Sequence, residues 1–272
     1  MTGAGVAVVT GGSRGVGKTI TRVLSEMGYA VHICARHDEE LRRTAEEIPN
    51  VRGARVDVTD RAATRAWLEA VIAQAGSIDV LVNNVGVMAA VGPFIRLDLE
   101  EWERVFDRNL FSMARICQQV VPVMMKRGGG CIINLSGGGG AYPRAYFSAY
   151  GCSKAAVLRF SDTLAEELKP FHIRVNAIAP GIQQSDLWRH AIRAGIHPPD
   201  GHDADPGKLA KLIRYLVSTP FVTGKFLHVE DAYEHIDEGV MAGELYTLRR
   251  ISPSGRSVIA PAGYVSPSIR LT

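Results

Sequence analysis

The chain has 272 residues, with a hydrophobic content of 46% and a charged content of 22%, which suits one large core and a single α/β domain. The net charge is only +3 and no long block of Lys or Arg occurs, so we expect neither nucleic acid nor a membrane as partner. An apolar run follows Met1 almost at once, and no uninterrupted run reaches about eighteen residues. We therefore expect no signal peptide, no membrane span and a cytoplasmic location.

The cysteines give no sign of a metal site. Cys34, Cys117, Cys131 and Cys152 are scattered without CxxC spacing, which argues against zinc and fits a reducing compartment. We interpret them as small buried hydrophobic residues and expect no metal.

Short runs rich in Val and Ile alternate along the chain with segments of helical periodicity. The expected strands are 6–10, 30–35, 51–56, 78–84, 131–136 and 173–179. Between the first four of them, apolar residues recur at three- and four-residue steps, as helices require. The alternation predicts a doubly wound, Rossmann-like parallel sheet with helices on both faces and ligands at the carboxyl ends of its strands.

The first expected strand runs into "TGGSRGVGKTI", residues 10–20. Gly11, Gly15 and Gly17 lie between a strand and a helix, where missing side chains permit a tight turn. Backbone N–H groups and the helix dipole can then meet a diphosphate. The pattern indicates a dinucleotide site, although a purely structural turn has the same glycines.

Two arginines indicate which dinucleotide is bound. Arg36 follows the second strand, where an NAD-binding protein carries an acid for the ribose 2′-hydroxyl, and Arg14 lies within the glycine turn. Guanidinium groups bind phosphate through paired, charge-assisted hydrogen bonds, so NADP is the expected cofactor. The alternative is a pair of solvated surface arginines.

Tyr150 and Lys154 are expected to transfer protons. A tyrosine is a poor acid or base near neutral pH unless a cation stabilises its phenolate. A lysine one helical turn later lies on the same face, and an oxidised nicotinamide adds a second positive charge. The spacing therefore predicts a catalytic pair.

Taken in order, these segments resemble those of the short-chain dehydrogenase/reductase family, over about residues 5–230. The matching segments are "TGGSRGVG" at 10–17, "DVTD" at 57–60, "NNVG" at 83–86, Asn109 of "RNLF", "YGCSK" at 150–154 and "NAIAPG" at 176–181. The resemblance implies an NADP-dependent alcohol dehydrogenase or ketone reductase that acts on a small molecule as a homo-oligomer, a dimer or tetramer. An epimerase that uses NADP transiently and a non-catalytic NADP-binding protein remain alternatives.

The resemblance also implies roles for individual residues. Asn109 would hold a water that links Lys154 to solvent, and Lys154 would bond the nicotinamide ribose. Asp57 and Val58 would contact the adenine, and Asn83 and Gly86 the cofactor's ribose. The remaining expected cofactor contacts are Gly11, Ser13, Arg14, Gly15, Val16, Gly17, Arg36, Tyr150, Pro180, Gly181, Ile182 and Ser185.

The expected catalytic serine is out of place. In the family it stands thirteen residues before the tyrosine, which here is Gly137, whereas Ser136 is fourteen residues before Tyr150. Either the glycine tract 137–140 bulges by one residue and turns Ser136 into the site, or that hydroxyl position is vacant. We favour Ser136, with Ser148, Tyr146 or a group of the substrate as substitutes.

The last third of the chain bears on the substrate. Residues 185–207, with Trp188, Arg189, His190, Arg193, His197 and His202, stand where this fold places a substrate lid. They favour a polar or anionic substrate, such as a sugar, cyclitol or carboxylated alcohol, although solvated lid residues would look the same. We expect the catalytic domain to span 1–232. The extension 233–272 has too little apolar periodicity for a second domain and is expected to pack over the site or a neighbouring subunit, or to remain a free tail.

Overall fold

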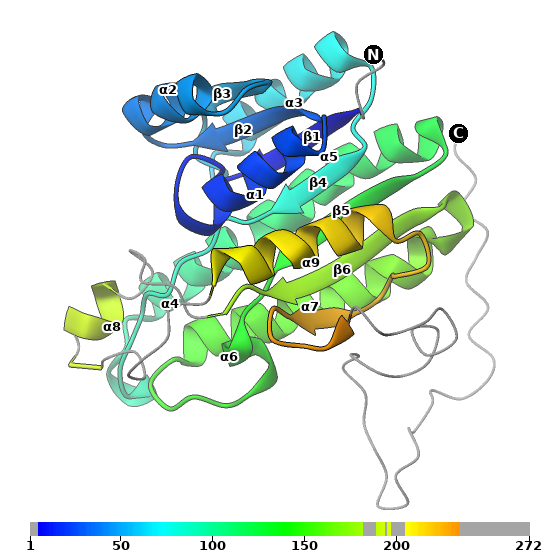
Figure 1. Ribbon diagram of the computed structural model, residues 1–272. Coiled ribbons are helices and arrows are strands. Elements are labelled where there is room, and N and C mark those ends of the chain that lie inside the picture. Colours follow the sequence, from blue (N-terminus) through cyan, green and yellow to red (C-terminus); the bar gives the residue numbers. More distant parts are fainter. Residues whose placement is uncertain (1–4, 182–188, 194, 197–204, 234–272) are drawn as a thin grey trace, which may run out of the picture.

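The chain forms one sheet of parallel strands in the order β3-β2-β1-β4-β5-β6-β7 (Figure 1). The computed structural model describes residues 5–181, 189–193, 195–196 and 205–233. The strands are β1 (Val6–Thr10), β2 (Ala30–Ala35), β3 (Val51–Arg55), β4 (Val80–Asn83), β5 (Gly130–Leu135), β6 (Ile173–Ala179) and β7 (Phe226–His228). The order reverses between β1 and β4, which confirms the predicted doubly wound sheet.

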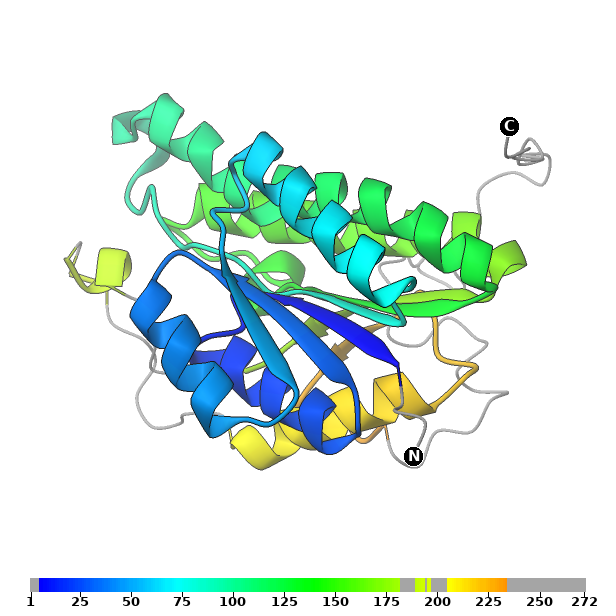
Figure 2. The ribbon, with the colours of Figure 1, turned by 90° about the horizontal axis from the view of Figure 1, so that it is seen from above.

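Helices cover both faces of the sheet (Figure 2). One face packs against α1 (Gly15–Glu26), α2 (Asp38–Glu47) and α9 (Pro206–Ser218). The other packs against α3 (Arg61–Ala75), α5 (Ser112–Arg127) and α7 (Ser148–Leu168). Each layer is amphipathic, with fully buried residues such as Leu24 of α1 and Leu68 of α3 pointing at the strands. The sheet is thus buried on both sides, and its two faces belong to two hydrophobic clusters.

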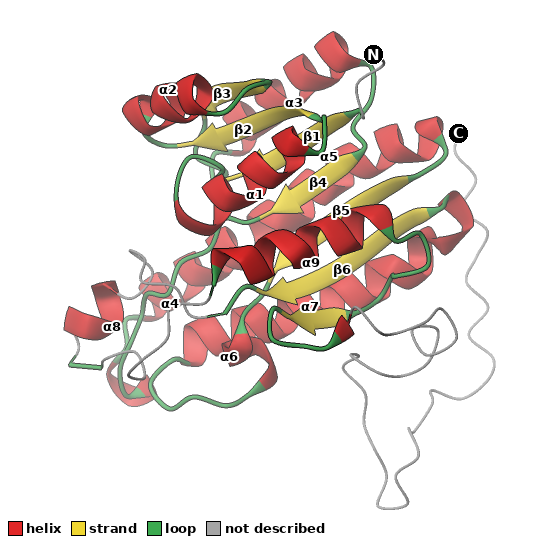
Figure 3. Cartoon of the chain, in the orientation of Figure 1, coloured by secondary structure: helices red, strands yellow, loops and turns green. Residues whose placement is uncertain are grey.

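The six strands expected from the sequence are present, with ends that differ by at most two residues (Figure 3). The seventh, β7, was not predicted, because its three residues are too few to show a periodic pattern. It pairs with β6 through Ile178 and Leu227 and closes that edge of the sheet.

Short elements complete the fold, and all of them except η3, which comes directly before β6, lie towards the carboxyl edge of the sheet. They are η1 (Phe94–Arg96), α4 (Leu99–Phe106), the π-helix η2 (Asp107–Phe111), α6 (Gly138–Ala141), η3 (Lys169–Phe171) and α8 (Arg189–Arg193). The π-helix interrupts what would otherwise be one long helix from α4 into α5, and Asn109 lies within it. Such interruptions are frequent at functional sites.

Parts of the expected lid and nearly all of the C-terminal extension, from residue 234, lie outside the described residues. In the part that is described, no helix is long and apolar enough to cross a membrane.

Candidate active site

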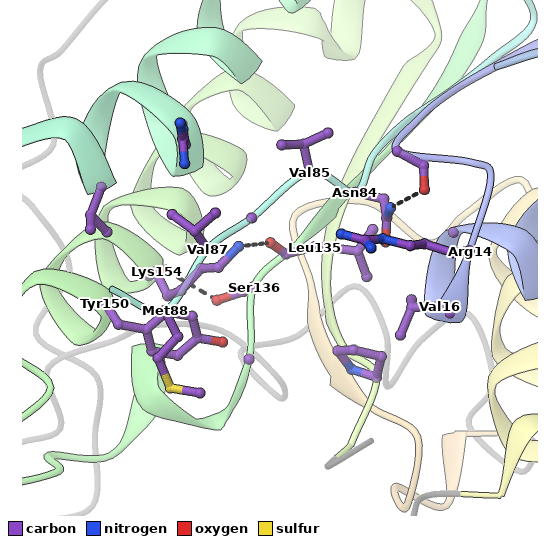
Figure 4. Close-up of a pocket in the computed structure, with 18 of the residues that line it drawn as sticks. Arg14, Val16, Asn84, Val85, Val87, Met88, Leu135, Ser136, Tyr150 and Lys154 are labelled. Carbon is purple, nitrogen blue, oxygen red and sulfur yellow. Dashed lines mark hydrogen bonds between the residues drawn. The ribbon is translucent and has the colours of Figure 1, made fainter. Parts of the chain in front are cut away.

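A cleft of about 1570 Å³ lies at the carboxyl ends of the strands. One end is formed by the turn between β1 and α1, and the other by Tyr150 and Lys154 of α7. Figure 4 shows Arg14 and Val16 on one side and Tyr150, Lys154 and Met88 on the other. The structure thus brings the two predicted halves of the site into one cavity.

The glycine turn depends on close backbone packing. A Cβ atom on Gly17 would overlap the carbonyl oxygen of Gly11, whose own φ of +65° favours glycine. The Asn84 side-chain amide donates to the carbonyl oxygens of Thr10 and Gly11, at 2.9 and 3.1 Å. Asn84 therefore fastens the turn to β4, a role that sequence analysis missed although the residue lies inside the "NNVG" segment.

The start of α1 fits a diphosphate. Arg14 occupies the N-cap position without a side-chain cap, and the first turn of the helix carries no acidic residue. Gly15 has φ +50°, and a Cβ atom there would meet nothing within 4 Å. Free N–H groups and the positive end of the helix dipole therefore face the cleft, which Ser13 and Val16 also line.

Arg14 and Arg36 line the same end of the cleft, and both are exposed. Glu40 of α2 lies beside them, with its carboxylate 3.5 Å from Nη1 of Arg14 and accepting a hydrogen bond from Ser13 Oγ at 3.2 Å. No motif in the sequence marks Glu40 for this role. The two guanidinium groups fit a phosphate, and Glu40 holds one of them at the turn.

Asp57 and Val58 line the cleft next to Arg36, as the resemblance implied. Burial alone would raise the pKa of Asp57, but hydrogen bonds from the backbone N–H and hydroxyl of Thr59, at 3.0 and 2.8 Å, hold that pKa below its ordinary value. The carboxylate is therefore ionised and held in place.

Asn83 requires a correction. Its side chain is buried and donates to Asn134 Oδ1 at 2.9 Å and Cys117 Sγ at 3.3 Å. Asn83 is the last residue of β4, and because alternate residues of a strand face opposite sides, its amide points into the layer beside α5. Asn83 does not line the cleft, unlike Gly86, which the resemblance placed with it at the cofactor's ribose.

Tyr150 and Lys154 are both buried at the base of the cleft. The Lys154 ammonium donates to the Leu135 carbonyl oxygen at 2.7 Å and lies 6.0 Å from the centre of the Tyr150 ring (Figure 4). Burial raises the pKa of Tyr150 to about 12, with the charge of Arg144 acting in the opposite direction, and burial lowers the pKa of Lys154 to about 8. In the polypeptide by itself, Lys154 therefore does not make Tyr150 the easily ionised group that its position suggested.

The structure also corrects the expectation for Ser136. Its N–H donates to the Ile178 carbonyl oxygen at 2.8 Å, continuing the β5–β6 ladder, and its hydroxyl donates to the carbonyl oxygen of Lys154 at 3.1 Å. A Cβ atom on Gly137 would lie 2.6 Å from the Tyr150 hydroxyl oxygen. The position facing the phenol is thus Gly137, and no bulge brings the Ser136 hydroxyl there.

The two substitutes named above do not fill this position either. Ser148 accepts a hydrogen bond from Trp102 Nε1 at 3.2 Å, and in the described part of the chain neither Ser148 nor Tyr146 lines the cleft. The polar side chains that the segment after the glycine tract contributes to the cleft are Tyr142 and Arg144. Neither residue could be predicted from the sequence, since no motif spacing marks them.

Asn109 holds the loop after β4. Its Oδ1 accepts from the N–H of Val87 at 2.7 Å, and its Nδ2 donates to the Val87 carbonyl oxygen at 3.0 Å and to Ser153 Oγ at 2.9 Å. A Cβ atom on Gly86 would lie 3.0 Å from Lys154 Nζ and 3.5 Å from Asn109 Oδ1. Asn109 is thus close to Lys154, and the water proposed between Lys154 and solvent remains a prediction.

Pro180 and Gly181 line the cleft after β6. Ile182 and Ser185 lie outside the described residues, as do Trp188, His197 and His202 of the expected lid. Arg193, in α8, lines the cleft. Among the described residues, no group of three or more His, Cys, Asp or Glu could hold a metal ion.

The strand order, together with a cleft at the carboxyl edge where that order reverses, assigns the chain to the doubly wound α/β proteins of the Rossmann type. A family model described as short chain dehydrogenase matches residues 5–194. The chain therefore belongs to the short-chain dehydrogenase/reductase family, a family of oxidoreductases.

Relatives and solved structures agree with this assignment. The chain is 32% identical over 234 residues to 3-oxoacyl-acyl-carrier-protein reductase FabG of Vibrio cholerae, covering 82% of this chain and 95% of the relative. It is 31% identical over 240 residues to 3alpha-hydroxysteroid dehydrogenase of Mediterraneibacter gnavus, covering 84% and 96%. A crystal structure of a variant of actinorhodin polyketide ketoreductase with NADPH matches with a TM-score of 0.76 at 29% identity, covering 87% of this chain and 97% of that one.

Proposed function

We propose that this protein is an NADP(H)-dependent alcohol dehydrogenase or ketone reductase. The observation that carries the proposal is a single cleft that joins the arginine-bearing turn of α1 to the buried pair Tyr150 and Lys154. One end fits a phosphorylated dinucleotide, and the other supplies a phenol as proton donor or acceptor.

The choice of NADP is supported by Arg14 and Arg36 at the cleft's α1 end. Guanidinium groups suit a 2′-phosphate, whereas an NAD site carries an acid for the 2′-hydroxyl. The ketoreductase with a similar fold was solved with NADPH, which points in the same direction.

The protein's own groups would handle the proton. When bound, NADP(H) would supply or accept the hydride at the carbonyl carbon. In reduction, the Tyr150 hydroxyl would give its proton to the carbonyl oxygen, so that ketone, hydride and proton together make the alcohol. The ammonium of Lys154, fixed by the Leu135 carbonyl, would supply positive charge beside the phenol and a donor for the nicotinamide ribose.

The glycine at position 137 favours a second candidate function. The residue facing the Tyr150 hydroxyl has no side chain to polarise a substrate carbonyl. This favours, as alternatives, a non-catalytic NADP-binding protein or an epimerase that uses NADP transiently. A sugar or cyclitol substrate remains a prediction, since the relatives described above are named for oxoacyl and steroid substrates.

Incubating the purified protein with NADPH and a panel of ketones tests the proposal. The panel should hold oxoacyl thioesters, oxo acids and their esters, steroid ketones, sugars and cyclitol ketones. Consumption of NADPH that is lost in Tyr150→Phe, but kept in Tyr146→Phe, supports a reductase. Tyr146 is the matched control, because it is an exposed tyrosine nearby that does not line the cleft.

Two other outcomes would contradict the proposal. Product formed without net use of NADPH would indicate the epimerase. Tight NADPH binding without reaction on any panel member would indicate the non-catalytic protein.

A further inference from the structure

Arg144 occupies the wall of the cleft beside the glycine tract. It lies between α6 and α7, and a Cβ atom on Gly138 would be 3.6 Å from its Nη2. The neighbouring glycines lie along the catalytic phenol, since a Cβ atom on Gly137 would be 2.6 Å from the Tyr150 hydroxyl oxygen and one on Gly139 would be 3.0 Å from Cε1 of its ring. The Arg144 guanidinium therefore lies beside Gly138, which is the next residue after Gly137, and Gly137 faces the Tyr150 hydroxyl.

The glycine tract contributes no side chain to the space beside Arg144 and Tyr150. The two groups are close enough that the positive charge of Arg144 lowers the pKa of Tyr150, against the larger opposing effect of burial. A ligand that reaches the phenol from the cleft thus comes within the field of this guanidinium.

In the described part of the chain, the Arg144 guanidinium makes neither an ion pair nor a hydrogen bond; only its carbonyl oxygen is bonded, by the N–H of Phe147 at 3.3 Å. Arg104, which also lines the cleft, differs in pairing with Asp98 and Glu100 at 3.6 and 3.5 Å. Arg144 is therefore an exposed cation that lines the cleft, and no described residue occupies its guanidinium donors.

We propose that Arg144 binds a carboxylate of the substrate, so that this site takes an oxo acid, or the corresponding hydroxy acid, with its carboxylate close to the reacting carbon. The inference rests on the proposed reductase function and names its substrate class. A substrate oxygen that accepts the Tyr150 proton faces Gly137, and the guanidinium beside Gly138 then reaches the substituent attached to the same carbon. A planar guanidinium binds a carboxylate through two parallel hydrogen bonds.

Matched pairs of substrates provide the test. Acetoacetate and 2-oxobutyrate are compared with their methyl esters, which keep the ketone and remove the charge, in the full-length protein with NADPH. In Arg144→Gln we expect kcat/KM for the acids to fall about 10- to 100-fold, mainly through KM, and kcat/KM for the esters to change less than about twofold. Arg144→Lys should recover part of the loss, and Arg61→Gln, at an exposed arginine of α3 outside the cleft, should have no effect.

An equal loss for acids and esters would overturn the inference, because Arg144 would then polarise the carbonyl itself or support the fold. So would a wild-type protein that reduces the esters as well as the acids.

Binding of oxamate, an unreactive carboxylate that resembles an oxo acid, separates this inference from the reductase proposal. Quenching of bound NADPH fluorescence reports its binding without turnover. We expect oxamate to bind the wild-type complex and to lose at least about tenfold in affinity in Arg144→Gln, with NADPH affinity unchanged. If oxamate binding depends on Arg144 in this way but the protein reduces no ketone, the carboxylate site is supported and the reductase proposal is contradicted. Absent or equal oxamate binding in the two proteins would overturn the carboxylate site, even if ketones are reduced.

Discussion

The two ends of the cleft are built differently. At the α1 end, the backbone makes the site. Gly17 packs closely against the Gly11 carbonyl oxygen, Asn84 bonds the turn to β4, and α1 begins without a side-chain cap. At the α7 end, side chains make it, with Tyr150 and Lys154 beside the glycine tract 137–140 and the exposed cation Arg144. On the proposed function, the α1 end holds the cofactor, with Arg14 and Arg36 facing its phosphate, and the α7 end holds the substrate.

If the two ends of the cleft act separately, a substitution at the α7 end should leave cofactor affinity unchanged, and one at the α1 end should leave turnover unchanged. The largest effect is expected for Tyr150→Phe, which removes the hydroxyl that we propose transfers the substrate proton. Turnover should fall about 1000-fold, within the range that general acid–base catalysis contributes. NADPH affinity, measured by fluorescence titration, should stay within about twofold. A similar loss of both would show that Tyr150 holds the cofactor instead.

The reciprocal change is Arg36→Asp at the α1 end. It removes a phosphate partner and adds a repelling carboxylate, so NADPH affinity should fall more than about tenfold while NADH binding suffers less. Turnover at saturating NADPH should be nearly unchanged. Arg14→Ala should act in the same direction but more weakly. Equal affinity of the unmodified protein for NADPH and NADH would contradict the assignment of NADP.

Adding the missing hydroxyl should not improve the enzyme. Gly137 has φ +156°, which side-chain-bearing residues rarely adopt, and a Cβ atom there would contact the Tyr150 hydroxyl oxygen at 2.6 Å. Gly137→Ser should therefore lower turnover about tenfold, by displacing the phenol. Gly76→Ser is the control, because Gly76 also has positive φ, +74°, but no neighbour within 4 Å of a Cβ atom. It should lose stability without losing activity, and faster turnover in Gly137→Ser would refute this account.

The smallest effect concerns stability and pH. Burial lowers the pKa of Lys154 from 10.5 to about 8 in the folded protein. Between these values the unfolded chain binds more protons than the folded one, so the contribution of Lys154 to stability rises with pH. In the protein without cofactor, the free energy of unfolding relative to Lys154→Met should increase by up to about 3 kcal/mol between pH 7 and 10.5. Denaturant unfolding at several pH values measures this, and a constant difference would show that Lys154 is not desolvated.

At both ends of the cleft, local rules decide what could be predicted from the sequence. The strands, the glycine turn and the pair Tyr150 and Lys154 follow from local rules: period-two strands, backbone approach, and a spacing of one helical turn. For Asn83 and Ser136 the sequence did not give the direction of the side chain: the Asn83 amide lies outside the cleft, and the Ser136 hydroxyl, although Ser136 lines the cleft, donates to the Lys154 carbonyl oxygen. A shift of one residue at the end of a strand moves a side chain to the other face, and only the sheet pairing fixes that face.

Arg144 could not be predicted, for a related reason. It enters the cleft through the path of the segment between α6 and α7, whose course depends on contacts with the rest of the fold. Glu40 is a similar case, since its contact with Arg14 joins α2 to the glycine turn.

The four consecutive glycines, residues 137–140, look like one flexible repeat in the sequence, but each packs against different neighbours. Gly137 and Gly139 are confined by the hydroxyl and ring of Tyr150, and Gly140 by the backbone of α7, 2.8 Å from where its Cβ would lie. A Cβ atom on Gly138 would make only an ordinary van der Waals contact, 3.6 Å from Nη2 of the flexible Arg144 side chain. Three of the four are thus confined by Tyr150 or by the backbone of α7, and Gly138 is the one with room for a side chain. A side chain added at Gly138 would therefore reshape the cleft beside Arg144 without meeting Tyr150.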